Sequence, residues 1–233
     1  MGSTRLPGKV LKEIEGETML ARVIERVRRA KLIDELLVAT TDQPADDAIV
    51  DECRRHSAKV SRGDQSDVLD RYYRAAQLAK VDVVVRVTAD CPLIDPMVAD
   101  KVVGAFHEAR PDYASNTLQR TYPRGLDTEV FSFSALARAW QEARKPHERE
   151  HVTPYIFEHP DKFKLLPVTS EADFSSHRWT VDTAEDLEFV RAIYDRLKSN
   201  AEFSGRDVLD LLDREPELID LNRAVMQKAL HES

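Results

Sequence analysis

Apolar residues recur along the chain at two different spacings. Between residues 19 and 30 they fall three and four positions apart, as on one face of a helix. The runs at 35–41 and 81–87 are short and rich in β-branched residues, which is typical of strands, and 81–87 best fits a buried strand. Strands and helices therefore alternate, which predicts an α/β fold with a mostly parallel sheet flanked by helices.

The same pattern can be followed to the C-terminus. Strands are predicted at 35–41, 58–61, 81–87, 129–133, 163–168 and 179–181. Helices are predicted at 19–30, 45–56, 67–79, 95–110, 133–143, 150–159 and 184–198, with two more within 205–231. The polar segment 113–128 is predicted to be a long functional loop. We expect one domain, 1–233, with a small inserted subdomain at about 113–178.

Composition excludes several classes of protein. With 233 residues, 42% apolar and 33% charged, the chain is typical of a globular protein with a sizeable core. A formal net charge of −8 argues against a nucleic-acid surface, which is basic. Cys53 and Cys91 form no C-x-x-C pair, so we expect reduced thiols. Because we find no signal peptide and no apolar run of membrane length, we expect a cytoplasmic protein.

Candidate chemistry begins at residues 2–9, which read Gly-Ser-Thr-Arg-Leu-Pro-Gly-Lys. Glycines let a backbone approach phosphate oxygens, hydroxyls donate hydrogen bonds, and Arg and Lys supply positive charge. A Walker A loop is excluded, because five residues separate the two glycines and Val10 stands where that motif needs Ser or Thr. The alternative is an ordinary solvated turn. The predicted nucleotide-binding residues here are Gly2, Ser3, Thr4, Arg5 and Lys9.

Two acids follow short apolar strands. Asp90 comes after the predicted strand 81–87, and Asp182 comes after 179–181. In open α/β sheets, ligands lie outside the carboxyl ends of the strands. Carboxylates beside a triphosphate suit Mg²⁺, so both acids are candidate metal ligands. For Asp182 the alternative is a helix N-cap, which the following Thr-Ala-Glu-Asp also favours.

Two further polar segments follow or precede predicted strands. Arg124, Asp127 and Glu129 could bind sugar hydroxyls or a carboxylate, although a polar turn into a strand is the alternative. Arg62 and Asp64 follow the strand at 58–61 and could reach the ribose or base of a nucleotide. A capped helix-entry loop explains that pair equally well.

Residues 147–151 match the zinc-protease pattern H-E-x-x-H, with His147 and His151 four positions apart and Glu171 as an imaginable third ligand. The surroundings argue against zinc. Pro146 precedes the motif directly, and Pro154 would disturb the same helix. We interpret the segment as a helix N-terminus whose acids complement the helix dipole.

Taken together, these motifs resemble the cytidylyltransferases that make CMP-activated sugars, and most closely their spore coat polysaccharide biosynthesis (SpsF-like) branch. The resemblance covers nearly the whole chain, and its strength lies in the order and separation of the motifs. They are 2–9, 38–42 (Val-Ala-Thr-Thr-Asp), 67–72 (Asp-Val-Leu-Asp-Arg-Tyr), 86–95 (Arg-Val-Thr-Ala-Asp-Cys-Pro-Leu-Ile-Asp), 124–129 (Arg-Gly-Leu-Asp-Thr-Glu), 150–153 (Glu-His-Val-Thr) and 179–182 (Trp-Thr-Val-Asp).

The resemblance implies a glycosyltransferase-A-like fold and transfer of CMP from CTP to a sugar of acidic or 2-keto-3-deoxy type, releasing pyrophosphate. It implies Mg²⁺ on Asp90 and Asp182, and triphosphate contacts from Arg5 and Lys9. His151 becomes a substrate-side or structural residue, with sugar binding as its predicted role, and is not a zinc ligand. The inserted subdomain becomes the sugar side, and a homodimer is plausible. The product would serve cell-surface polysaccharide biosynthesis.

The chain departs from the family at its start, because the family has an apolar first strand directly before the Gly-Ser-Thr-Arg loop. We therefore expect a sheet that lacks this strand, and a natural start further upstream. Two other functions stay open. One is a glycosyltransferase that uses a nucleotide sugar, although Asp90-Cys-Pro lacks the usual D-x-D metal motif. The other is a truncated nucleotide-binding homologue without activity.

Overall fold

The computed structural model describes residues 5–227. Its strands are β1 (Glu13–Ile14), β2 (Glu17–Thr18), β3 (Leu37–Thr41), β4 (Lys59–Gly63), β5 (Val83–Arg86), β6 (Tyr113–Ser115), β7 (Glu129–Ser132) and β8 (Leu165–Pro167). Its α-helices are α1 (Met19–Arg28), α2 (Asp47–Arg55), α3 (Val68–Ala79), α4 (Pro96–Ala109), α5 (Phe133–Glu142), α6 (Pro146–His151), α7 (Pro154–Phe157), α8 (Ala184–Leu197) and α9 (Gly205–Arg214). Three 3-10 helices are η1 (Lys9–Leu11), η2 (Pro44–Asp46) and η3 (Pro216–Leu221).

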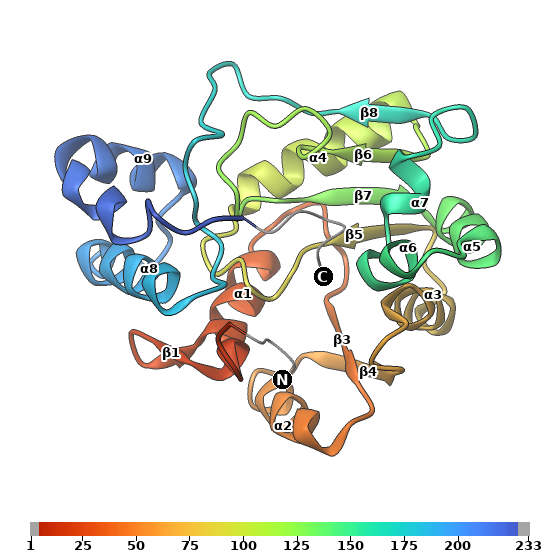
Figure 1. Cartoon of the computed structure of the whole chain (residues 1–233), viewed down its shortest axis with the longest axis horizontal. Coiled ribbons are helices and arrows are strands. Elements are labelled where there is room, and N and C mark those ends of the chain that lie inside the picture. The colour runs from red at the N-terminus through yellow and green to blue at the C-terminus, as the bar shows by residue number, and fades with distance from the viewer. Residues whose placement is uncertain (1–4, 228–233) are drawn as a thin grey trace.

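A mixed four-stranded sheet, in the order β5-β7-β6-β8, is the largest sheet of the described residues and lies in the upper right of Figure 1. β5, β6 and β8 run in the same direction, whereas β7 runs antiparallel to both of its neighbours. β3 and β4 form a separate parallel pair, and β1 and β2 form a hairpin. The α/β class with helices flanking the sheets is therefore confirmed.

The sheet is divided between β3 and β5. Each of these strands pairs on one side only, with β4 and β7 respectively, so each keeps one unpaired edge among the described residues. All four residues of β5 are only half-buried. The strand predicted at 81–87 does form, but the prediction that it is buried is wrong. Full burial of a strand requires cover along its edge as well as on its faces.

Helices cover both faces of the four-stranded sheet. Side chains alternate across a strand, so neighbours in sequence face opposite layers. Tyr113 and Phe131 pack with α3 and α5 on one face. Ala114 and Val130 pack with α4 on the other. This alternation explains why such short strands carry fully buried residues.

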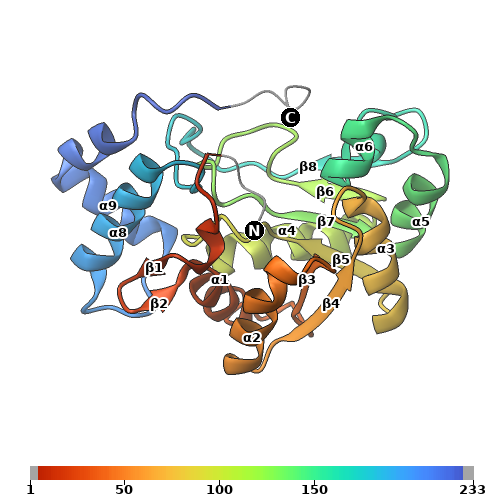
Figure 2. The ribbon, with the colours of Figure 1, turned by 60° about the horizontal axis from the view of Figure 1, so that its bottom comes forward.

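The C-terminal helices α8 and α9 form a second layer at the opposite end of the molecule from α5 and α6 (Figures 1 and 2). Their apolar faces pack around Trp179, whose side chain is 1% exposed. Trp179 directly precedes the Thr-Val-Asp182 segment, so this cluster fixes one side of the candidate site.

Several predicted boundaries were wrong for local reasons. The segment 113–128 is not all loop, because its first residues form β6. The helix predicted at 150–159 spans only the end of α6 and all of α7, and the chain breaks between them at Val152 and Thr153, just before Pro154 begins α7. Residues 179–181 form no strand, and only an isolated bridge between Arg124 and Arg178 remains there. The last C-terminal helix is the 3-10 helix η3, although residues 228–231 of that prediction lie outside the described part.

Candidate active site

Two acids that are distant in sequence meet beside β5. Asp90 follows β5 in the chain and Asp182 lies just before α8. The N–H of Val181 donates to the Asp90 carbonyl at 2.8 Å, and the Thr180 hydroxyl donates to the same oxygen at 3.2 Å. These contacts hold the two backbones together. Asp90 and Asp182 are called the acid pair below.

Lys9 lies between the two carboxylates. Its Nζ donates to Asp90 Oδ2 at 2.8 Å, to Asp182 Oδ1 at 3.0 Å and to the Val181 carbonyl at 2.8 Å. All three N–H donors of the ammonium are thus used. Burial opposes the charge, but the two carboxylates outweigh it and raise the pKa of Lys9. Gly8, at φ 65°, starts the turn of η1 that presents this lysine.

Two arginines hold the remaining oxygen of Asp182. Arg5 Nη2 lies 2.9 Å from Asp182 Oδ2, and Arg178 Nη2 donates to the same oxygen at 2.8 Å. Burial would raise the pKa of Asp182, but Lys9, Arg178 and Arg5 together lower it below its ordinary value. Asp182 therefore carries its negative charge at neutral pH.

The N-terminus of α8 orients Arg178. Asp186, which is fully buried, accepts from Arg178 Nε at 2.8 Å and from Nη2 at 3.0 Å. Asn222 donates to Asp186 Oδ1 at 3.0 Å and to the Arg178 carbonyl at 2.9 Å. The N-cap of α8 is Thr183, so the alternative that made Asp182 the cap is wrong. The Asp182 carboxylate is instead directed at the cations.

The loop that carries Arg124 is attached to the same segment. The Trp179 N–H donates to the Arg124 carbonyl at 2.6 Å, and the Arg124 N–H donates to His177 at 3.0 Å. Gly125, at φ 112°, permits this approach, because a Cβ there would lie 2.6 Å from Thr180 N. The structure therefore brings Arg124 to the neighbourhood of the acid pair.

The two charged side chains of this loop differ in their partners. Asp127 accepts both ends of the Arg120 guanidinium, at 2.7 and 2.8 Å. The half-buried Arg124 guanidinium makes no hydrogen bond or ion pair within residues 5–227. Burial and the charge of Arg120 lower the pKa of Arg124. A guanidinium in this setting is suited to bind an anionic group of a ligand.

Glu129 is buried among fixed partners. Its carboxylate pairs with Arg86 and accepts the hydroxyls of Tyr113 and Thr153, each at 2.6 Å. These contacts join β5, β6, β7 and the start of α7. These contacts give Glu129 a structural role. Its contact with a sugar stays a prediction.

Arg62 and Asp64 have local partners. Arg62 donates to the carbonyls of Thr41 and Gln43 and pairs with Asp47, and so links β4 to the start of α2. Asp64 accepts from the N–H groups of Ser66 and Asp67 ahead of α3. Both arrangements agree with the helix-entry alternative, and their nucleotide-binding role remains a prediction.

The H-E-x-x-H segment forms the six-residue helix α6. Glu148 caps this helix, accepting the N–H groups of Arg144 and Lys145 at 2.9 Å each. Within the described part, the metal-competent group here is His147, Glu148 and Glu158, and it includes neither His151 nor Glu171. His147, His151 and Glu171 therefore do not form a three-ligand group among these residues.

His151 is half-buried at the end of α6. It precedes Val152, a β-branched residue held at φ 75°, which is a strained conformation. The substrate-side role of His151 remains a prediction. Gly2, Ser3 and Thr4 lie outside the described residues.

Sequence reasoning missed the residues that support the acid pair. Arg178, Asp182 and Asp186 recur every four positions, one cation followed by two acids, and this spacing was the available signal. Their contacts depend on an irregular segment entering α8, so no helical pattern predicts them. The sequence around Asn222 and Arg120 contains no pattern that predicts their contacts.

Comparison with known proteins identifies the chain. A family model described as cytidylyltransferase matches residues 1–224. The chain belongs to the cytidylyltransferase family. It is similar to the spore coat polysaccharide biosynthesis protein SpsF of Bacillus subtilis, with 32% identity over 93% of this chain and 92% of that protein.

Two further relatives agree. A 3-deoxy-manno-octulosonate cytidylyltransferase of Anaeromyxobacter dehalogenans is 30% identical over 82% of this chain and 93% of its own length. The solved structure of a cytidylyltransferase from Leptospira borgpetersenii superposes with a TM-score of 0.92 and 35% identity, covering 97% of this chain and 95% of that one. This cytidylyltransferase is thus a nucleotidyltransferase enzyme, and the family predicted from the motifs is confirmed.

One negative finding accompanies the identification. Among residues 5–227 of the cytidylyltransferase, every helix is too short or too polar to cross a membrane.

Proposed function

We propose that this cytidylyltransferase transfers CMP from CTP to an acidic sugar of the 2-keto-3-deoxy type, releasing pyrophosphate, for cell-surface polysaccharide biosynthesis. The family and the cytidylyltransferase relatives support nucleotidyl transfer. The SpsF relative supports a polysaccharide role. A cytoplasmic location and a homodimer with its sugar side at about 113–178 remain part of this proposal.

The observation that carries the proposal is the ammonium of Lys9 held between Asp90 and Asp182. Two carboxylates aimed at one cation form a point where positive charge is favoured. The same donor set fits Mg²⁺, which usually takes one or two carboxylates and completes its shell with water and phosphate oxygens. Asp90 and Asp182 would hold that ion, which neutralises phosphate charge when bound.

The basic residues around this point are suited to a triphosphate. Arg5 and Lys9 supply two positive charges beside the acid pair. Arg124 is available for the carboxylate of an acidic sugar, for which a planar guanidinium is a matched partner. Orientation and charge neutralisation then account for catalysis.

The transfer step is a direct displacement. A hydroxyl oxygen of the sugar forms a bond to the α-phosphorus of CTP, the bond from that phosphorus to the bridging oxygen breaks, and pyrophosphate leaves. The hydroxyl proton passes to solvent. Cys91 is next to Asp90, but burial raises the pKa of its thiol well above the ordinary value, so it is a poor nucleophile.

Pyrophosphate release tests the proposal. Purified protein is incubated with CTP, Mg²⁺ and a panel of 2-keto-3-deoxy and neutral sugars. We expect release only with the acidic sugars, and loss of release in Asp90→Asn with an unchanged circular dichroism spectrum. Release with neutral sugars alone would reject the acceptor class, and an active Asp90→Asn would reject the metal role of Asp90.

The same assay, together with a melting-temperature measurement, distinguishes this function from the two alternatives, a glycosyltransferase and a homologue without activity. Consumption of a nucleotide sugar in place of CTP would indicate a glycosyltransferase. If CTP and Mg²⁺ leave the melting temperature unchanged and no pyrophosphate forms, the result would favour a homologue without activity.

A further inference from the structure

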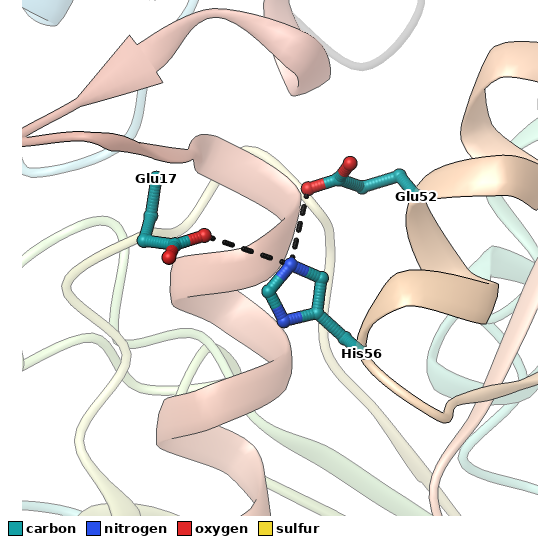
Figure 3. A group of neighbouring side chains, drawn as sticks. All are labelled: Glu17, Glu52 and His56. Carbon is teal, nitrogen blue, oxygen red and sulfur yellow. Dashed lines mark ion pairs between the residues drawn. The ribbon is translucent and has the colours of Figure 1, made fainter.

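A second polar cluster lies where the β1–β2 hairpin meets the end of α2. Glu17 belongs to β2, Glu52 belongs to α2, and His56 is the residue that ends α2. His56 Nε2 lies 3.3 Å from Glu52 Oε1 and 3.6 Å from Glu17 Oε2 (Figure 3). The three ligand atoms lie within 4.8 Å of one another.

These separations suit one metal ion. Four ligands placed about 2.0–2.1 Å from Zn²⁺ in a tetrahedron stand about 3.3–3.4 Å apart. The two distances from His56 are close to that edge. Imidazole and carboxylate are both ligands of Zn²⁺ and its neighbours. We propose that Glu17, Glu52 and His56 bind a divalent transition-metal ion of the Zn²⁺ class, with water as the fourth ligand.

The central ligand of this site is already held in place. The Glu52 side chain is 1% exposed, and its Oε1 accepts the Thr18 hydroxyl at 2.6 Å. A ligating carboxylate usually carries such an outer hydrogen bond, which fixes its direction. The other oxygen pairs with Arg55, so Oε1 is the one turned toward His56.

His56 is fixed through its backbone. Its N–H donates to the Glu52 carbonyl at 3.2 Å, and its carbonyl accepts from Arg28 at 2.7 Å. Glu17 lies on the hairpin and is the exposed member of the three. Only this outer ligand has to adjust when an ion enters.

Charge also favours a cation here. When His56 is neutral, two carboxylates face one imidazole, and Arg55 contacts only one of them. A divalent ion neutralises this pair and uses the neutral imidazole as a ligand.

The similar cluster of His147, Glu148 and Glu158 is a natural comparison. There Glu148 already accepts two backbone N–H groups that begin α6, and a metal would compete with that cap. Within the described residues, the Glu52 carboxylate accepts no backbone N–H group. This difference makes His147→Ala a matched control.

Zinc binding can be measured by calorimetry at pH 7.5, with the acid pair already occupied by Lys9. We expect one equivalent of Zn²⁺ to bind, with affinity reduced at least about tenfold in His56→Ala and in Glu52→Gln, and unchanged in His147→Ala. Bound Co²⁺ should show the visible absorption of a tetrahedral ion in the wild type. His56→Gln serves as a second variant if His56→Ala unfolds.

A structural readout accompanies the titration. Zinc should slow amide hydrogen exchange in residues 13–18 and in the last turn of α2, because the ion joins these segments. Absence of Zn²⁺ binding at millimolar concentration, or binding that survives His56→Ala, would overturn the proposal. Loss of binding in His147→Ala with retention in His56→Ala would assign the ion to the other cluster. None of these results depends on the transferase activity.

Discussion

At the scale of single residues, Asp182 shows how one carboxylate can be held by three cations from two separate parts of the chain. Lys9 and Arg5 come from the N-terminal segment, whereas Arg178 precedes the acid by four residues. Arg178 is itself oriented by the buried Asp186. The direction of the Asp182 side chain thus depends on a planar guanidinium bound at both ends.

Replacing Arg178 with Lys should expose this dependence. An ammonium is a point charge and cannot contact Asp182 and Asp186 in the same fork geometry. On the proposed function, in which Asp182 holds Mg²⁺, we expect kcat/KM to fall about 10- to 100-fold, as is typical when an outer partner of a metal ligand is changed. The Mg²⁺ concentration needed for half-maximal activity should rise.

The matched control is Arg196→Lys. Arg196 also pairs with two acids near α8, Asp195 and Glu215, but it is largely exposed. Its replacement should leave both kinetic parameters within twofold, as surface ion pairs contribute about 0–1 kcal/mol. Equal losses in the two variants would contradict a positioning role for Arg178.

The cysteines give a pH prediction. Burial, helped by Glu52, raises the pKa of Cys53 to about 11, from an ordinary value of 9.0. Below pH 9 the thiol is protonated in both states, so it contributes nothing to the pH dependence. Between about 9 and 11 only the unfolded state ionises, so the free energy of unfolding falls as pH rises. Denaturant titrations of wild type and Cys53→Ser at pH 8 and 10 measure this slope.

The same burial predicts low reactivity. Both thiols should resist iodoacetamide at pH 8 in the folded protein and react once it is unfolded. Rapid labelling of native Cys53 would show that its thiol is open to solvent, contrary to its burial.

At the residue scale, the strand-end rule singled out Asp90 and Asp182, and the structure brings these two acids together, although residues 179–181 form no strand. Their role as metal ligands stays a prediction. The rule could not supply Arg178 or Asn222, because their positions result from packing between α8 and η3. Arg62 illustrates the opposite case, since a charged residue after a strand has satisfied local partners.

At the scale of elements, the loop through Arg124 and the segment through Trp179 lie side by side at a glycine. Gly125→Ala should therefore be costly, because its Cβ would lie 2.6 Å from both Thr180 N and the Trp179 carbonyl carbon. The strained φ alone contributes about 1–3 kcal/mol. We expect a loss of stability beyond that figure, with lower activity as Arg124 moves.

Gly16→Ala is the control for Gly125→Ala. Gly16 also has a positive φ, of 80°, but no atom lies within 4 Å of the added Cβ. It should lose about 1–2 kcal/mol from backbone strain and nothing from steric conflict. Chemical denaturation of both variants measures the difference, and equal losses would contradict close approach at Gly125.

Element boundaries followed the sequence where amphipathic periodicity was long. The predicted ranges of α3 and α4 included their caps, Asp67 and Asp95. Those of α1 and α8 began one residue after the caps, Thr18 and Thr183. The three-residue strand β6 was not predicted, because so short a strand shows no clear alternation of apolar and polar residues. The hairpin of β1 and β2 was missed for the same reason.

At the scale of the whole molecule, Arg26 connects regions far apart in sequence. This buried side chain of α1 donates to the Ile94 carbonyl at 2.6 Å and to the Phe203 carbonyl at 3.0 Å. Its guanidinium also lies over the Phe203 ring, 4.4 Å from the centroid. Arg26 thereby joins α1, the entry to α4 and the C-terminal helices.

We expect Arg26→Met to lower the free energy of unfolding by about 2–4 kcal/mol, since each buried carbonyl left without a donor costs about 1–3 kcal/mol. Arg29 contacts the same C-terminal region from the exposed surface, at Ala201 and Glu202. Arg29→Met should cost less than about 1 kcal/mol. Urea unfolding of the two variants checks this, and similar losses would show that burial of Arg26 does not matter.

The three bonds of Lys9 have a consequence for the order in which ligands arrive. Lys9 is a counter-ion that belongs to the chain itself, so the two carboxylates do not repel one another and bare Mg²⁺ gains little by entering. A nucleotide changes this balance, because its phosphates offer the lysine a new anionic partner. On the proposed function, metal and CTP therefore enter together, and Mg²⁺ added alone stays weakly bound.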